Sequence, residues 1–344
     1  MSHPADDDSP IELDLDQLRF EPLADRPSKV QIADLGVPAH PGATLDDWLD
    51  GLPGQLAGRS FKRLRDAIVG SRRAGRPVIV ALGGHVVKTG CSPYLVDWMR
   101  RGVINGLAMN GSAAIHDLEL AVAGRTSEDV AARLLAGQFG FARETSELFA
   151  DACDRAAGDG GGLGRALGEL VVERGGPGLD SSLLAEAYRR KIPLTVHVAV
   201  GTDIVHMTGR LDGAALGAAT LRDFRIISGV VAGLAGGVWL NLGSAVVLPE
   251  VFLKAVAIVS NLGYPLDGLT TANLDFQQQY RGLLNVLGRP GGEGIALTGH
   301  HELMIPLLHA AVVNRLAAEP KGAIPAPHIG RARIERPVAD GRAS

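Results

Sequence analysis

The chain has 344 residues, of which 46% are hydrophobic, 21% charged and 4% aromatic, and its formal net charge is −4. This composition suits a globular protein with a large buried core. It argues against nucleic-acid binding, because the chain has neither a basic surface charge for phosphates nor many aromatic rings for stacking. No apolar run reaches the roughly 20 residues that cross a bilayer, and the acidic start lacks signal-peptide features. We therefore expect a cytoplasmic protein with no nucleic-acid or membrane partner.

Three parts are predicted: an N-terminal extension over residues 1–50, an α/β domain over 51–318 and a C-terminal tail over 319–344. In the domain, helical apolar spacing alternates with short buried-strand patterns, which predicts a doubly wound, mostly parallel Rossmann-like sheet flanked by helices. We expect about six strand–helix units. The predicted strands are 78–82, 106–109, 192–200, 237–243 and 267–272. The predicted helices are 60–74, 92–101, one from about 114, 127–157, 163–174, 181–191, 214–235, 249–262 and 301–317.

The first predicted strand runs into a glycine pair, and three polar residues follow: His85, Lys88 and Thr89. A strand, a glycine turn and a helix present free N–H groups to an anionic or nucleotide ligand. The segment matches neither the G-x-G-x-x-G fingerprint nor the phosphate loop. We therefore predict a ligand site here without a specific motif to name it, and Lys88 also fits a surface lysine.

Further polar side chains follow the other predicted strands, where the carboxyl ends of parallel strands form the ligand crevice. Six of the ten histidines fall at such positions. The candidates beyond the first strand are Asn110, Ser112, His116, Asp117, His197, Thr202, Asp203, His206, Asn241, Gly243, Ser244, Thr270, Thr271, Asn273, Asp275, His300, His301 and Glu302. His116 and His300 also fit the first turns of helices. Asp203 follows a buried strand, so its carboxylate needs a hydrogen-bonding or charged partner, and His206 is one candidate.

Several motifs resemble the deoxyhypusine synthase family. They are GHVVKTG at 84–90, MNGSAAIHDLE at 109–119, the segments 181–203 and 237–243, TANLD at 271–275 and GHHELMIPLL at 299–308. A weaker resemblance is to NAD-using cyclodeaminase domains that act on ornithine. The family resemblance implies a Rossmann-like fold, a homotetramer, and NAD that oxidises an amine of spermidine to an imine before an aminobutyl unit passes to a lysine of a translation factor. It implies NAD contacts near His85, Lys88, Asn110, Gly111, Thr271, Asn273, Asp275 and His300, to which we add Thr89 from the first turn.

The sequence departs from the family at its catalytic positions. Leu287-Gly288-Arg289 stands where the family has Trp-Gly-Lys, and an arginine cannot form the Schiff base that a desolvated lysine forms. His116 stands where an acidic residue beside spermidine is expected, whereas Asp203 remains where an amine-binding carboxylate is expected. We therefore expect an NAD-dependent enzyme that is not a true deoxyhypusine synthase.

The predicted reaction is hydride removal from a carbon that bears an amine or hydroxyl, on a polyamine or a basic amino acid. His116 or His206 would take the proton, since a neutral imidazole suits this work near neutral pH. Asp203 would anchor a cationic group, and Arg289 would bind a substrate carboxylate.

Two other functions stay open. Imidazole and carboxylate together suit a divalent metal that activates water, as in a hydrolase or lyase, although no H-x-x-x-H spacing supports one and no ligand set is predicted. The groups involved would be His85, His116, His197, His206, His300, His301 and Asp203. The second alternative is a non-catalytic nucleotide-binding protein.

Overall fold

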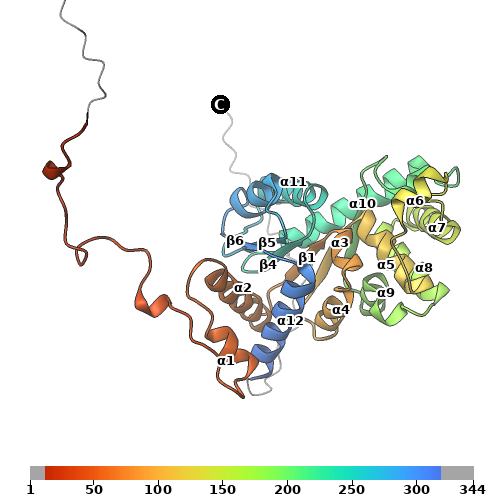
Figure 1. The fold of residues 1–344 in the computed structure, drawn as a ribbon. Helices are drawn as coiled ribbons and strands as arrows, with labels where there is room; N and C mark the ends of the chain where they lie inside the picture. Colours follow the sequence, from red (N-terminus) through yellow and green to blue (C-terminus); the bar gives the residue numbers. More distant parts are fainter. Residues whose placement is uncertain (1–11, 319–344) are drawn as a thin grey trace, which may run out of the picture.

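The computed structural model describes residues 12–318 (Figure 1). The predicted C-terminal tail and residues 1–11 of the predicted extension lie outside the described residues. Six strands form one parallel sheet in the order β3-β2-β1-β4-β5-β6. The strands are β1 Val78–Leu82, β2 Gly106–Asn110, β3 Leu194–His197, β4 Val238–Leu242, β5 Thr270–Asp275 and β6 Glu293–Thr298. The predicted doubly wound α/β fold is confirmed, with the order reversing between β1 and β4.

Helices cover both faces of the sheet (Figure 1). The helices are α1 Leu45–Asp50, α2 Leu56–Arg73, α3 Gly84–Lys88, α4 Ser92–Arg100, α5 Gly111–Ala123, α6 Val130–Leu135, α7 Arg143–Asp159, α8 Leu163–Arg174, α9 Leu183–Arg190, α10 Gly213–Ala232, α11 Val247–Asn261 and α12 His301–Ala317, with short helices η1 Leu15–Gln17, η2 Ile32–Asp34, η3 Leu179–Ser181, η4 Ile204–Met207 and η5 Gly282–Gly288. One face carries α2, α4, α5, α8, α9, α12 and the first half of α10, and the other carries α11 and the second half of α10.

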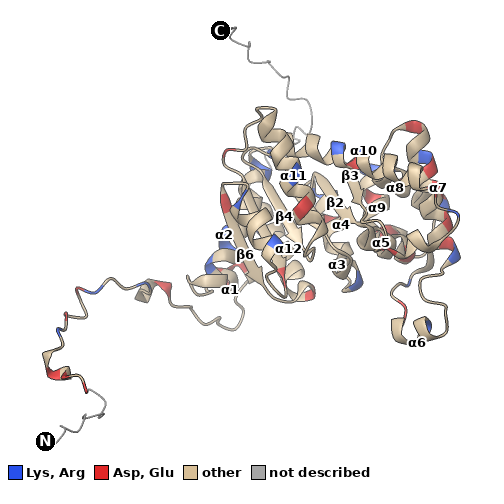
Figure 2. Cartoon of the chain, turned by 90° about the horizontal axis from the view of Figure 1, so that it is seen from above, with Lys and Arg blue, Asp and Glu red and all other residues tan. Residues whose placement is uncertain are grey.

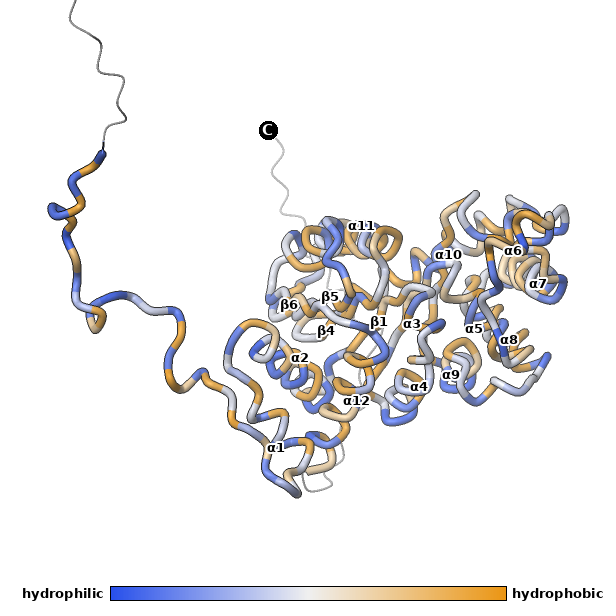
Figure 3. The backbone as a smooth tube through the Cα atoms, in the orientation of Figure 1, coloured by the Kyte–Doolittle hydropathy of each residue, from blue (hydrophilic) through white to orange (hydrophobic). Residues whose placement is uncertain are grey.

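The strand β1 is apolar throughout because both of its faces are covered. In β1, Val78, Val80 and Leu82 pack into the core on one face, whereas Ile79 and Ala81 pack into the core on the other. Figure 3 shows the same hydrophobic concentration along the central strands. This two-sided burial explains why the sequence of β1 reads as an unbroken apolar run.

The segment before α1 runs away from the domain (Figures 1 and 2). Most of its side chains lie in solvent, and Phe20 and Ile32 are each 89% exposed, although Asp34 pairs with Arg59 of α2 at 3.2 Å. The helix α1 begins at a capping box between Thr44 and Asp47, and it contacts α12. Leu49 of α1 is fully buried, so α1 packs on the domain although it falls within the predicted extension.

Several predicted elements differ from those observed. The predicted strand 192–200 is shorter in the structure, because β3 pairs with β2 only from Leu194 to His197. The predicted helix 127–157 is broken into α6 and α7, because Gly137 and Gly140 adopt positive φ. The strand β5 extends to Asp275, beyond its predicted end. The strand β6 was not predicted, since it is a half-exposed edge strand whose buried positions alternate. Among the helices of residues 12–318, none combines the length and the apolar character needed to cross a membrane.

A buried carboxylate joins α5 to α9. Asp117 is 1% exposed, and it accepts hydrogen bonds from Ser182 Oγ at 2.7 Å, Leu183 N–H at 2.9 Å and Leu184 N–H at 3.0 Å. These donors include orphan N–H groups at the start of α9, so the carboxylate caps that helix. Burial raises the pKa of Asp117, and the three hydrogen bonds oppose that rise.

Replacing this carboxylate should destabilise the domain strongly. In Asp117→Ala, three buried donors lose their acceptor, and we expect a loss of roughly 3–5 kcal/mol in the free energy of unfolding. Ser182→Ala removes one donor and one cap and should cost about 1–2 kcal/mol. Denaturant unfolding of both variants measures the difference. Equal losses in the two variants would contradict the role assigned to the carboxylate.

Candidate active site

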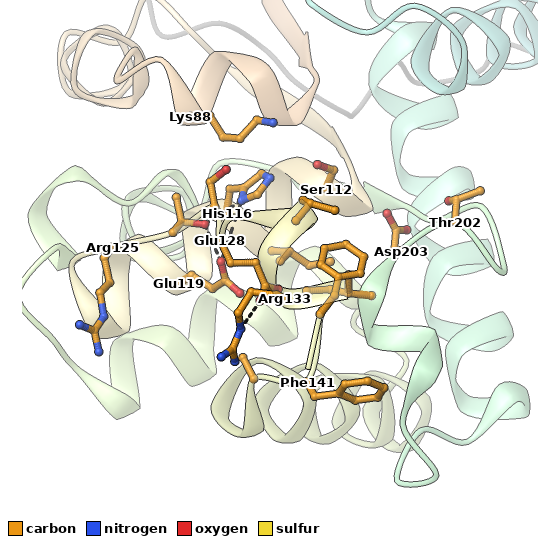
Figure 4. Close-up of a pocket in the computed structure, with 17 residues that line it drawn as sticks. Lys88, Ser112, His116, Glu119, Arg125, Glu128, Arg133, Phe141, Thr202 and Asp203 are labelled. Carbon is orange, nitrogen blue, oxygen red and sulfur yellow. Dashed lines mark hydrogen bonds and ion pairs between the residues drawn. The ribbon is translucent and has the colours of Figure 1, made fainter. Parts of the chain in front are cut away.

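A cavity of about 490 Å³ opens beside α3 and α5, where β2 and β3 end (Figure 4). It brings together Lys88 from α3, His116 from α5 and Asp203 from the loop after β3. Phe139 and Phe141 add apolar surface. The candidates Ser112 and Thr202 also line it, so five predicted residues from distant parts of the sequence share one cavity.

The imidazole of His116 belongs to a hydrogen-bonded chain. Its Nδ1 lies 2.7 Å from Thr126 Oγ1, which in turn donates to Glu119 Oε2 at 2.5 Å. Thr145 Oγ1 donates to the other oxygen of Glu119 at 2.9 Å. Burial, together with the nearby charge of Lys88, lowers the pKa of His116 to about 4. The cavity therefore holds a neutral histidine at neutral pH.

Asp203 presents a carboxylate to the start of α5. A Cβ on Gly111 would collide with Asp203 Oδ2, so the glycine makes room for the carboxylate. Oδ2 is buried and has no hydrogen-bond partner within the described residues. Burial raises the pKa of Asp203. A buried carboxylate oxygen of this kind is an unfilled acceptor for a cationic or hydrogen-bonding ligand.

His206 pairs with Asp203 through a capping box at the start of η4, but its imidazole makes no hydrogen bond to the carboxylate. Its Nδ1 accepts hydrogen bonds from the backbone N–H groups of Gly201 at 3.2 Å and of Asp203 at 3.3 Å, so the ring shapes the loop. His197 is buried in β3 beside Thr195, and burial lowers the pKa of His197 to about 3. Neither His197 nor His206 lines the cavity.

Two histidines, His85 and His301, lie in contact near the point where the strand order reverses. His301 is fully buried, and its Nε2 lies 3.0 Å from the carbonyl oxygen of Leu274, which can only accept. Nδ1 of His301 therefore accepts a hydrogen bond from Nδ1 of His85 at 3.0 Å. This leaves Nε2 of His85 as an acceptor, and the ring centroid of His85 is 5.9 Å from that of Phe276. Burial and the nearby His301 lower the pKa of His85.

The glycine turns at this point pack against protein groups. A Cβ on Gly83 would collide with the carbonyl oxygen of Gly243, and one on Gly84 would collide with Ser112 Oγ and lie 3.0 Å from His116 Cδ2. The helix α3 thus borders both places, with His85 toward the reversal point and Lys88 in the cavity. The glycines permit this close packing of backbone and side chains.

The other predicted cofactor residues have mixed positions. Asn110 caps α5 by accepting from the Ala113 N–H at 2.9 Å, and Thr89 donates to the carbonyl of His85 at 2.9 Å. Asn273 accepts a hydrogen bond from Asn241 at 2.6 Å inside the sheet. These polar groups are used by the fold itself.

Asp275, Thr271 and His300 lie at different depths. Asp275 ends β5 near the reversal point, is 6% exposed, and accepts from the Phe276 N–H at 2.8 Å. Thr271 is the second residue of β5, so it lies inside the strand and not at its carboxyl end. The side chain of His300 is 70% exposed, and the neighbouring His301 is the histidine that faces the sheet.

Arg289 lies away from the cavity. It follows η5, donates to Asn285 Oδ1 at 2.6 Å, and precedes the amino end of β6. Because β6 runs parallel to β5 from Thr270 onward, Arg289 lies at the amino ends of the strands. Asp203 lies at their carboxyl ends, on the opposite side of the sheet's length. The structure therefore does not bring Arg289 together with His116.

The histidines do not converge on a metal site. Within residues 12–318, no group of three or more His, Cys, Asp or Glu side chains is arranged to hold a metal ion. The pair at His85 and the single rings of His116, His197 and His206 occupy separate places.

Sequence reasoning did not select Glu119 or Thr126 for the site, and it assigned the NAD contact to His300 although His301 was also a candidate. Glu119 is three residues from His116, a spacing that places both on one face of a helix. His301 begins the buried series His301, Ile305 and Leu308, whose helical spacing identifies the ring that faces the core. Thr126 carried no such signal.

The chain shares its fold with solved proteins of low sequence identity. AgrE, solved with ornithine and NAD+, is 15% identical with a TM-score of 0.50, and the match covers 76% of this chain and 34% of AgrE. ArgZ, an arginine dihydrolase from the ornithine-ammonia cycle in cyanobacteria, is 17% identical with a TM-score of 0.46, over 76% of this chain and 34% of ArgZ. A candidate deoxyhypusine synthase from Entamoeba histolytica is 9% identical with a TM-score of 0.45, over 81% of this chain and 96% of that protein.

This chain therefore spans about a third of the length of AgrE and ArgZ. No model of a known protein family matches the sequence, and no curated protein does. Sequence comparison therefore gives no evidence that the chain belongs to the deoxyhypusine synthase family.

The buried carboxylate of Asp203 should make stability depend on pH. Because burial raises its pKa, the folded state keeps this proton to a higher pH than the unfolded state, whose value is about 3.9. The contribution of Asp203 to stability should therefore fall as pH rises from about 4 through its folded pKa. Asp203→Asn cannot ionise, so its melting temperature should exceed that of the wild type by a margin that grows from about pH 4 toward neutral pH. A margin that does not change with pH would contradict this assignment.

Proposed function

We propose that this chain is an NAD-dependent enzyme that oxidises a carbon–nitrogen bond of a small amine. The observation that carries the proposal is one cavity lined by a neutral histidine, His116, and by Asp203, whose buried Oδ2 has no hydrogen-bond partner among residues 12–318. A protonated amine would supply the partner that Asp203 Oδ2 lacks. The apolar rings of Phe139 and Phe141 suit the methylene groups of a polyamine or a basic amino acid.

The reversal between β1 and β4 supports a dinucleotide in the neighbouring crevice, since ligands of doubly wound sheets bind at this point. Two acceptors there suit the hydroxyl groups of such a ligand, namely Nε2 of His85 and the carboxylate of Asp275. AgrE, which shares the fold, was solved with ornithine and NAD+, and we propose ligands of the same two classes here. When bound, NAD would accept the hydride that leaves the substrate carbon.

His116 and Asp203 would do the remaining work. A protonated amine becomes an iminium ion by losing one proton from nitrogen and a hydride from carbon, and Nε2 of His116 would take that proton. Asp203 would orient the amino group, and Lys88 lies where it would contact a substrate carboxylate. The polyamine and amino-acid alternatives therefore differ in the use of Lys88.

The test combines NAD binding with reduction. We expect the purified protein to bind NAD in native mass spectrometry, as a tetramer with one NAD per chain, and to form NADH when putrescine or ornithine is added. These two compounds differ by one carboxylate, so they separate the two substrate classes. His85→Ala should weaken NAD binding, whereas His116→Gln should bind NAD but form no NADH. Arg289→Gln is the matched control at the opposite edge and should retain both properties.

Failure to bind NAD would overturn the proposal. If the protein binds NAD but forms no NADH with any polyamine or basic amino acid, it would instead be a non-catalytic nucleotide-binding protein.

A further inference from the structure

A threonine hydroxyl bridges His116 and a carboxylate in the cavity wall. Thr126, in the segment between α5 and α6, lies 2.7 Å from His116 Nδ1 and 2.5 Å from Glu119 Oε2. The imidazole and the carboxylate themselves are 4.0 Å apart between the same nitrogen and oxygen. Among residues 12–318, the hydrogen bonds that connect the ring to the carboxylate therefore pass through this hydroxyl.

We propose that Thr126 and Glu119 are positioning residues that hold His116 as its Nδ1–H tautomer and leave the Nε2 lone pair facing the cavity. The hydroxyl of Thr126 has one proton, and a carboxylate oxygen can only accept. Because that proton is donated to Glu119, the hydroxyl must accept from His116, so Nδ1 carries the ring proton. Glu119 is held in turn by the buried Thr145, which donates to Oε1 at 2.9 Å.

The position of the ring agrees with this assignment. Gly84 leaves room for the Cδ2 edge of the imidazole, and Nε2 adjoins that edge. Figure 4 shows the ring between Lys88 and Glu119. Nε2 is thus on the side of α3 and Lys88, and Nδ1 is on the side of Thr126.

The charged groups around His116 determine how readily its ring gains a proton, and the hydrogen-bonded link to Glu119 contributes to this. Lys88 on α3 disfavours the imidazolium, and burial adds to the same effect. The other charged groups of the cavity wall are Asp203, Arg125, Glu128 and Arg133, and Glu128 is paired with Arg133. Glu119 is therefore the carboxylate that the bridge connects to the ring, and it would stabilise the positive charge when Nε2 gains a proton.

The tautomer can be measured without any substrate. The catalytic use of His116 rests on the proposed function, but the tautomer assignment does not. A wrong tautomer assignment can therefore be distinguished from a wrong proposed function. Nitrogen NMR of protein labelled in histidine separates the Nδ1–H, Nε2–H and doubly protonated forms, and the His116→Gln spectrum identifies the signals of His116. We expect the wild type to show the Nδ1–H form at neutral pH.

Variants then test the bridge. Thr126→Val keeps the shape but removes the hydroxyl, and the Nδ1–H form should be lost, whereas Thr126→Ser should keep it. Thr145→Val is the matched control, since it also removes a hydroxyl from Glu119 but does not touch the ring, and it should keep the Nδ1–H form. With a substrate that reduces NAD, Thr126→Val should lower kcat about 100-fold with little change in KM. An Nε2–H form in the wild type, or an unchanged tautomer in Thr126→Val, would overturn the inference.

Discussion

The cavity depends on how α5 is turned about its axis, and the buried carboxylate of Asp117 sets that rotation. Asp117 binds the start of α9 through Ser182 and two backbone N–H groups, so one face of α5 is held against the domain. Successive residues of a helix point about 100° apart. His116, one residue earlier, is therefore directed away from α9 and toward α3, where it can meet Lys88.

Close packing at glycines brings the remaining groups together. Gly111 admits the carboxylate of Asp203, and Gly84 admits the ring of His116 and the hydroxyl of Ser112. A side chain at either position would displace a functional group. The glycine-rich turns that suggest a phosphate cradle in the sequence thus serve contacts between protein groups, which also explains why they follow no nucleotide-binding fingerprint.

The doubly wound strand order separates two groups of polar residues along the carboxyl ends of the strands. His85 and His301 lie at the reversal between β1 and β4, whereas His116 and Asp203 lie toward β2 and β3. The helix α3 borders both places, so the length of this one short helix separates them. A shared fold accommodates many chemistries, and the particular pairing of groups in this cavity carries the functional proposal.

The sequence by itself determined the class of fold, because buried parallel strands read as apolar runs and crossover helices have a different period. It also located His116 and Asp203, since ligand crevices follow strand ends. Only the tertiary structure decided that these two share a cavity, that His301 and not His300 faces the sheet, and that Arg289 lies at the opposite edge. These relations depend on strand order and helix rotation, which are set by contacts between residues distant in the chain. The bridging position of Thr126 is of the same kind, because a loop hydroxyl carries no periodic signal.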